Sequence, residues 1–115
     1  MADQIVHVEV TGKDGAKLQQ FYTQLFDWKL NVMQPGNYGL LERGDGGIGG
    51  GIAGSDDSNA RGVTIYVQVA DLQAALDKAE RLGGRTVVPP TEIPDMVTFA
   101  QFVDPEGNRI GLIKG

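Results

Sequence analysis

Hydrophobic and polar positions alternate in two segments of the chain, residues 5–10 (IVHVEV) and 63–69 (VTIYVQV). Strict alternation predicts half-buried β-strands, because successive side chains of a strand point to opposite faces. One face of each predicted strand is aliphatic and suits packing against a helix. The other face carries the polar residues, which are His7 and Glu9 in the first strand and Thr64, Tyr66 and Gln68 in the second.

A segment with helical periodicity follows each of these strands. Apolar residues recur at the i, i+3, i+4, i+7 spacing of one helix face, first at Leu18, Phe21, Tyr22, Leu25 and Phe26, then at Leu72, Ala75, Leu76, Ala79 and Leu82. Asp14 and Asp71 are suitable N-caps, and Gly83 is a suitable stop for the second helix. We expect Phe21, Tyr22 and Trp28 to be core and helix-packing residues.

Three more short strand candidates follow each helix, at 28–33, 38–43 and 48–54 in the first half and 85–88, 97–103 and 109–115 in the second. The two halves overlay, with His7 on Thr64 and Gly50 on Gly111. This internal repeat predicts two βαβββ modules within one domain, residues 1–115. Module one covers about 4–54, a polar linker covers 55–62, and module two covers about 63–115.

Residues 44–54 (GDGGIGGGIAG) contain seven glycines in eleven positions. A dinucleotide-binding glycine motif needs a helix immediately after it, whereas here a linker and a strand follow. We therefore expect a turn at 43–47, with Gly46 and Gly47 serving its backbone, and then the last strand of module one. The glycines at 49–51 would let another backbone or a ligand approach closely. Residues 89–97 (PPTEIPDMV) are predicted to form a loop, because prolines remove ladder donors.

Composition narrows the possible functions. The chain has 115 residues, a net charge of −5 and scattered basic residues, which argues against a nucleic-acid partner. It has no cysteine, so disulfides, thiolate zinc sites and cysteine nucleophiles are excluded. No targeting peptide and no apolar run of membrane-spanning length is recognisable. A cytoplasmic protein that does not bind a membrane is the expectation.

Several motifs resemble the vicinal oxygen chelate superfamily, which includes glyoxalase I, bleomycin-resistance proteins and extradiol dioxygenases. They are IVHVEV, FYTQLFDWKL (with Asp27 where glycine is usual), VADLQAALDKAERLGG and DPEGNRIGLI. Within that superfamily the chain is most similar to small proteins related to lactoylglutathione lyase, whose function is unassigned. The resemblance implies an α+β fold in which two tandem βαβββ modules form a cup-shaped mixed sheet, completed in a homodimer.

The resemblance also implies where metal ligands would stand, namely at His7, Gly50, Thr64 and Gly111. Glycine has no side chain and a threonine hydroxyl is a poor ligand for a transition metal, so three of the four positions cannot serve. We expect no metal and no other cofactor. An atypical site that combines His7 with Glu9, Tyr66 or Gln101 stays open.

The polar faces supply the candidate site residues. His7 is the only histidine; it is either a general base or a hydrogen-bonded polar residue of the cup. Glu9 could raise the pKa of His7 or act as the base itself. Ligand-binding candidates are Thr64, Tyr66, Gln68 and Gln101, together with the backbone at Gly50 and Gly111.

Three functions remain in view. The first is an enzyme, metal-dependent or metal-free, with lyase, isomerase or dioxygenase activity on a small oxygenated molecule. The second is a metal-free binding module whose dimeric cup sequesters a small molecule, and this is the function we expect. The third is a structural or regulatory dimer with a vestigial cup.

Overall fold

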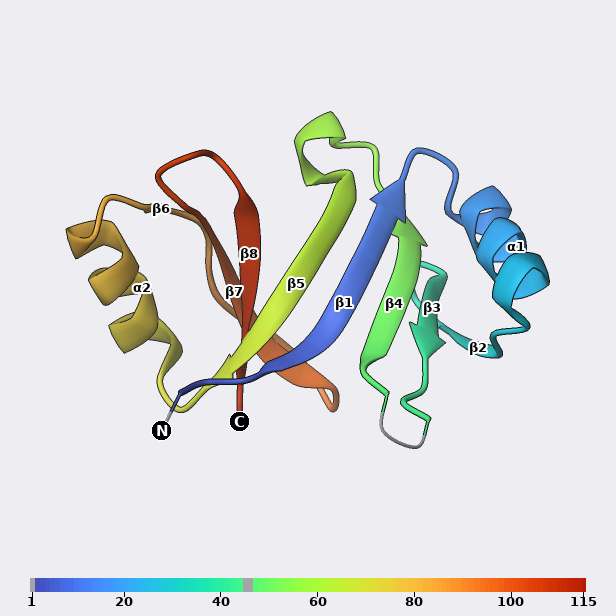
Figure 1. Cartoon of the computed structure of the whole chain (residues 1–115), viewed down its shortest axis with the longest axis horizontal. Coiled ribbons are helices and arrows are strands. Elements are labelled where there is room, and N and C mark those ends of the chain that lie inside the picture. Colours follow the sequence, from blue (N-terminus) through green and yellow to red (C-terminus); the bar gives the residue numbers. More distant parts are fainter. Residues whose placement is uncertain (1, 45–46) are drawn as a thin grey trace. The chain divides into compact units, whose positions relative to one another are not determined.

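The computed structural model describes residues 2–44 and 47–115, which form an α+β fold (Figure 1). The order of the main elements is β-α-β-β-β followed by the same order again, which confirms the predicted repeat. Module one contains β1 (Ile5–Gly12), α1 (Gly15–Phe26), β2 (Leu30–Met33), β3 (Tyr38–Leu41) and β4 (Gly49–Gly54). The single turn η1 (Ser58–Ala60) follows, and module two contains β5 (Gly62–Val69), α2 (Leu72–Arg81), β6 (Arg85–Ile93), β7 (Val97–Val103) and β8 (Arg109–Lys114).

Each module contributes four strands with the same connectivity. The order is β2-β3-β4-β1 in module one and β5-β8-β7-β6 in module two. The first and last strands of each module pair in parallel, β1 with β4 and β5 with β8, whereas the other pairs are antiparallel. The mixed sheet that the sequence predicted is therefore present in both repeats.

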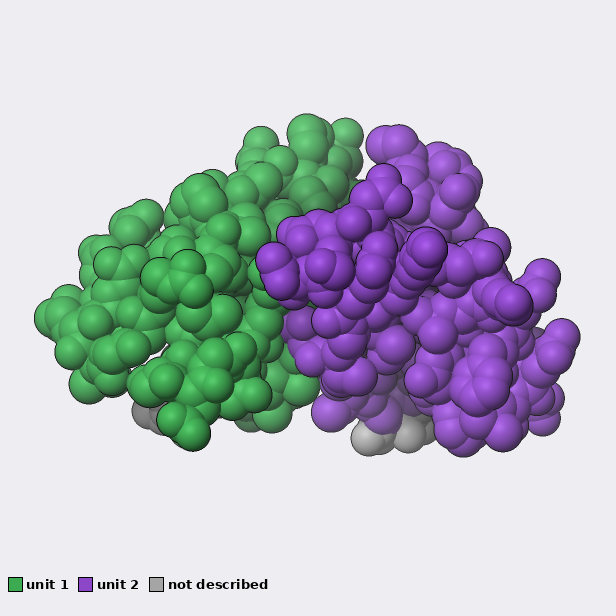
Figure 2. Space-filling model, turned by 90° about the horizontal axis from the view of Figure 1, so that it is seen from above, with its two compact units in different colours: residues 1–6, 65–115 green, residues 7–64 purple. Residues whose placement is uncertain are grey.

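The chain forms two compact units, shown in different colours in Figure 2. One unit is residues 7–64, and the other joins the N-terminal residues up to Val6 to residues 65–115. A backbone hydrogen bond of 2.9 Å from Gln68 N to Gln4 O ties the N-terminal segment to β5. The first residues of β1 thus belong to the unit that contains module two.

The helices begin where the sequence predicts. The Asp14 side chain accepts a hydrogen bond from Lys17 N at the start of α1, and the Asp71 side chain accepts one from Ala74 N at the start of α2. Gly83 has a φ of +105° just after α2, the left-handed conformation expected of a helix stop. No helix in the described part of the chain is long and apolar enough to span a membrane.

The core of module two lies between α2 and one face of its strands. Leu72 and Leu76 from the helix pack against Val69, Ala100 and Leu112 from the strands, and Leu76 is only 1% exposed. Leu112 pairs with Val67, two residues before Val69 on β5, so Val69 and Leu112 project from the same side of the sheet. Val67 and Val69 of the aliphatic face therefore pack on the helix side, as expected for alternating strands, whereas Val63 at the start of this face is 67% exposed.

Helix α1 differs from the prediction, because much of its apolar stripe faces outward. Phe21 and Leu25 are each 57% exposed, and Trp28 is also exposed, so the prediction of a core position is wrong for Phe21 and Trp28. The predicted packing on the helix is present for Trp28, whose ring lies against those of Tyr22 and Phe26. Their rings pack mainly on neighbouring aromatic rings, with a Phe26–Trp28 centroid distance of 4.9 Å. The strand that α1 contacts, β4, has the sequence GGGIAG, so Ile52 is the one large side chain that this strand offers the helix.

The segment 89–97 is also not the predicted loop. Strand β6 continues through Pro89 and Pro90 to Ile93 and pairs with β7, and only residues 94–96 form a turn. Proline is tolerated here because β6 is the last strand in the order of its module, and its register shifts between Thr86 and Thr91. The rule that proline is excluded applies to central strands, and β6 is not a central strand of its module.

Strand β4 occupies the second part of the glycine-rich segment 44–54, as predicted, whereas the predicted turn at 43–47 includes residues outside the described part of the chain. Gly47 N donates a hydrogen bond to Gly44 O at 3.0 Å, and β4 begins at Gly49. Gly46, which the sequence assigned to the turn, lies outside the described residues. Gly49–Gly54 is a strand, and only the single turn η1 separates it from β5, so no α-helix begins directly after these glycines as a phosphate-binding turn requires.

Candidate functional site

Polar side chains of module one meet across the glycine-rich strand β4. Tyr38 lies on β3 and reaches over Gly51 of β4 to residues of β1, the next strand in the order. Its hydroxyl group lies 2.8 Å from His7 Nε2 and donates a hydrogen bond of 3.0 Å to Glu9 Oε2. Both of the predicted catalytic residues are thus brought together, by a tyrosine that the sequence did not single out.

The glycine at position 51 makes this crossing possible. A Cβ atom added to Gly51 would overlap the hydroxyl oxygen and Cζ of Tyr38, so any side chain there would displace the phenol ring. Glu9 pairs with Gly51 and His7 with Gly49, which places these four residues on one face of the sheet. The close approach expected at 49–51 is therefore made by a side chain of the protein itself.

His7 is half-buried on this face, and its burial lowers the pKa of its imidazole below the ordinary value of 6.5. Removal from water disfavours the charged imidazolium, so the neutral ring prevails at neutral pH. A neutral imidazole can accept a proton or a hydrogen bond, as a general base or a polar ligand contact requires. The rings of His7 and Tyr38 are nearly parallel, with an interplanar angle of 14°.

Module two contains a corresponding arrangement. Tyr66 lies on β5 and reaches across Gly111 of β8, so that its hydroxyl accepts a hydrogen bond of 2.7 Å from Gln101 Nε2 on β7. Arg109 NH1 in turn donates a hydrogen bond of 2.8 Å to Gln101 Oε1. Because a guanidinium only donates, it fixes the orientation of the Gln101 amide toward the tyrosine. Tyr66 and Gln101 are 5% and 8% exposed.

The strand register corrects one position of the sequence overlay. Gly111 pairs with Tyr66, and Gly51 pairs with Glu9, the counterpart of Tyr66 in module one. Gly50 instead pairs with Val8, and a Cβ atom on it would lie 2.6 Å from Val8 O, on the opposite face from His7. Gly51 is therefore the counterpart of Gly111, and the overlay of Gly50 on Gly111 was wrong by one residue.

The remaining predicted residues lie on the polar face of β5. Thr64 is buried, whereas Gln68 is exposed and its side chain covers Gly115.

Two residues of the polar networks were missed by sequence reasoning, Tyr38 and Arg109. Tyr38 begins a predicted strand and shares its face with Leu40, but only the register of β3 against β4 reveals that it points over a glycine.

The residues present do not fit a metal ion in the arrangement that the resemblance implies. A ligating side chain on the last strand of either module would overlap a tyrosine, Tyr38 above Gly51 or Tyr66 above Gly111. Thr64 offers only a neutral hydroxyl. Within residues 2–44 and 47–115, no three side chains of the His, Cys, Asp and Glu types cluster closely enough to hold a metal.

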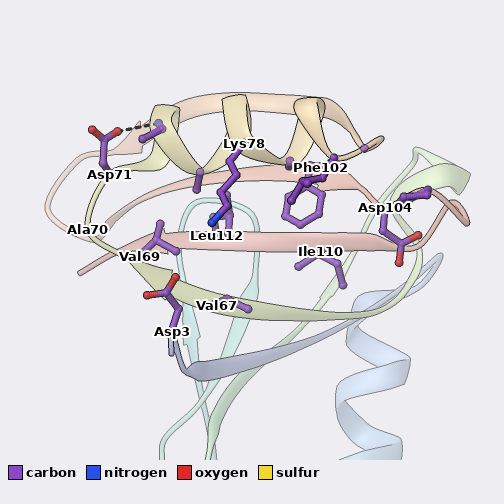
Figure 3. Close-up of a pocket in the computed structure, with 16 residues that line it drawn as sticks. Asp3, Val67, Val69, Ala70, Asp71, Lys78, Phe102, Asp104, Ile110 and Leu112 are labelled. Carbon is purple, nitrogen blue, oxygen red and sulfur yellow. Dashed lines mark hydrogen bonds between the residues drawn. The ribbon is translucent and has the colours of Figure 1, made fainter. Parts of the chain in front are cut away.

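A separate groove of about 600 Å³ lies on the helix side of module two (Figure 3). Its floor is apolar, formed by Val67, Val69, Phe102, Ile110 and Leu112, and the Lys78 side chain points toward it from α2. The carboxylates at its rim include Asp71, which caps α2, and Asp104, whose pKa is lowered by hydrogen bonds from Asn108. None of the site residues predicted from the sequence lines this groove.

Comparisons with known proteins identify the relatives of the chain. The proteins named "Putative glyoxylase CFP32" from Mycobacterium bovis and Mycobacterium tuberculosis are 31% identical over 78 residues. The match covers 68% of this chain but only 30% of those proteins, so the chain spans less than a third of their length.

Solved structures share the fold over nearly the whole chain. A glyoxalase/bleomycin resistance protein/dioxygenase superfamily member from Vibrio splendidus has a TM-score of 0.67 at 16% identity, covering 99% of this chain and all of that one. Methylmalonyl-CoA epimerase from Mycobacterium tuberculosis has a TM-score of 0.71 at 17% identity, covering 96% of this chain and 86% of that one. At such identities the likeness establishes the fold alone.

The model of one protein family matches residues 4–112, nearly the entire chain. Its description agrees with the resemblance carried by the strand, helix and turn motifs of the sequence, and the repeated fold agrees with the solved structures. The chain belongs to the Glyoxalase/Bleomycin resistance protein/Dioxygenase superfamily.

Proposed function

We propose that this protein binds a small oxygen-bearing molecule at the polar faces of its modules without a metal ion. The observation that carries the proposal is the tyrosine that lies over a last-strand glycine in each module, Tyr38 over Gly51 and Tyr66 over Gly111. The phenol rings occupy the space that a ligating side chain at position 51 or 111 would need. Their hydroxyls, with His7 and Gln101, provide hydrogen-bonding groups in place of a metal.

We propose further that the binding form is a homodimer. The supporting observation is the group of exposed apolar side chains on and just after α1, Phe21, Leu25 and Phe26 with Trp28, because a partner chain would remove them from water. Sedimentation-equilibrium analysis of the purified protein tests this: a mass of twice the chain is expected, and a monomer at every concentration would refute the dimer.

Metal analysis tests the metal-free proposal directly. The purified protein is assayed for bound elements and titrated with nickel, zinc, manganese and iron salts. The proposal predicts less than stoichiometric metal, with no change between the wild type and the His7→Ala variant. A stoichiometric metal that disappears in His7→Ala would overturn it.

A thermal-shift screen tests binding, because a ligand that prefers the native state must stabilise it. The panel contains small 2-oxo and 2-hydroxy acids, other polar metabolites and bleomycin. A compound that raises the melting temperature of the wild type should do so less for Tyr38→Phe and Tyr66→Phe. Tyr22→Phe, which removes a hydroxyl from α1, is the matched control. If none of these compounds shifts the wild type, the binding proposal fails.

A metal-free isomerase or lyase is the second candidate, and His7 favours it. The lowered pKa of this imidazole, next to Tyr38 and Glu9, suits a base that takes a proton from a carbon next to a carbonyl group. A compound from the screen is incubated in D₂O with the wild type and with His7→Ala. Exchange of a carbon-bound hydrogen that only the wild type catalyses would favour the enzyme, whereas its absence favours the binding module.

A further inference from the structure

Three groups of module one form one continuous hydrogen-bonded chain. His7 Nε2, the Tyr38 hydroxyl and Glu9 Oε2 follow one another at 2.8 Å and 3.0 Å. His7 and Glu9 are two residues apart on β1 and share its polar face. The chain therefore links the only imidazole of the protein to a carboxylate through a single hydroxyl group.

The directions of these hydrogen bonds follow from the hydrogens that each group possesses. An ionised carboxylate only accepts, and a tyrosine hydroxyl has one hydrogen to donate. Because Tyr38 donates that hydrogen to Glu9, its oxygen can only accept from His7. The hydrogen between His7 and Tyr38 must then reside on Nε2 of the imidazole.

We infer that Glu9, acting through Tyr38, holds His7 in the tautomer that carries its hydrogen on Nε2 and leaves the lone pair on Nδ1. Tyr38 and Glu9 are positioning residues in this assignment, since they determine which ring nitrogen is basic.

The surroundings of the three groups maintain this arrangement. Burial lowers the pKa of His7, so the ring is neutral and has a defined tautomer at neutral pH. Gly51 leaves the room in which Tyr38 crosses β4, so the phenol ring keeps its place between the two residues of β1. Neither feature depends on a bound ligand.

Nitrogen-15 NMR of the imidazole tests the inference, because the protein has one histidine and gives one pair of ring-nitrogen signals. The ligand-free wild type at neutral pH should show a protonated Nε2, an unprotonated Nδ1 and an Nε2-bound hydrogen protected from exchange with water. Tyr38→Phe should lose this protected hydrogen, and the two nitrogen signals should move toward an average of both tautomers. Glu9→Gln should weaken the preference for one tautomer. An amide can both donate and accept a hydrogen bond, so it no longer fixes the direction of the hydrogen bond from Tyr38.

Tyr22→Phe is the matched control and should leave the imidazole signals unchanged. A wild type with its hydrogen on Nδ1, or with averaged tautomers, overturns the inference. A Tyr38→Phe variant that folds and keeps the wild-type signals also overturns it. If Tyr38→Phe does not fold, the wild-type spectrum still decides which nitrogen carries the hydrogen. Because no ligand is present, failure of this test is distinct from failure of the proposed function.

Discussion

Replacing Gly51 by alanine tests the central structural argument, that β4 lacks side chains so that Tyr38 can cross it. The added methyl group would overlap Oη, Cζ and Cε2 of Tyr38, whereas ordinary contacts between such atoms are about 3.5–4.0 Å. The phenol ring must therefore leave its place. Its hydrogen bonds to His7 and Glu9, now 2.8 Å and 3.0 Å, would then be lost or badly strained.

The expected cost follows from these changes. Overpacking of this kind costs about 1–3 kcal/mol, and each lost hydrogen bond costs about 1 kcal/mol. Alanine recovers about 0.4–1 kcal/mol by restricting the unfolded chain, because the backbone at Gly51 is not in the left-handed region. We expect the Gly51→Ala variant to lose about 2–4 kcal/mol in the free energy of unfolding.

Urea denaturation, followed by circular dichroism and by the fluorescence of Trp28, measures this loss. Gly49→Ala is the matched control, since it lies on the same strand and face but a Cβ atom there meets nothing closer than Leu41 O at 3.5 Å. Its stability should change by less than about 1 kcal/mol. In the Tyr38→Leu background, which lacks the clashing atoms, Gly51→Ala should also be nearly neutral. Equal losses for Gly49→Ala and Gly51→Ala would refute the reasoning.

Other predictions concern the core and the polar networks. Leu76→Ala should cost about 2–5 kcal/mol in urea denaturation, because Leu76 is almost fully buried; a loss under about 1 kcal/mol would contradict the assigned core. Arg109→Met should cost about 1 kcal/mol, and much less in the Gln101→Leu background, because its hydrogen bond to Gln101 is then already absent. The lowered pKa of His7 means that its contribution to stability is complete above its ordinary value of 6.5 and is lost as the pH falls through the folded-state pKa. The wild type should therefore lose more stability than His7→Gln between about pH 7.5 and about pH 5, and parallel curves would contradict the shift.

The fold was predictable because its signals are local. Alternation at 5–10 and 63–69, the two apolar stripes and the caps Asp14 and Asp71 each specify one element, and their repetition specifies the order. The errors arose where burial depends on what an element packs against. The exposed Phe21 of α1 and the prolines of β6 could be interpreted only once the neighbouring surface and the edge position were known.

The candidate site was predictable in part for the same reason. His7 and Glu9 share a strand, so alternation alone places them on one face. Tyr38 belongs to another strand, and its contact with them depends on the register of β3, β4 and β1, which no local pattern specifies. The error of one residue at Gly50 has the same origin, because a shift of one position in a strand moves a residue to the opposite face.

The glycines at 51 and 111 are therefore understood only together with the tyrosines above them. With glycine at position 51 or 111, the last strand offers no ligating side chain there. With a tyrosine lying over that position, any other residue would overlap the phenol ring. A large ligating residue in the last strand and a tyrosine crossing it need the same volume, so the two arrangements exclude each other within a module. Conversion between them requires both residues to change, because either single change creates an overlap or an empty space. This coupling in both modules is the physical reason for our proposal that the polar faces bind a ligand without a metal ion.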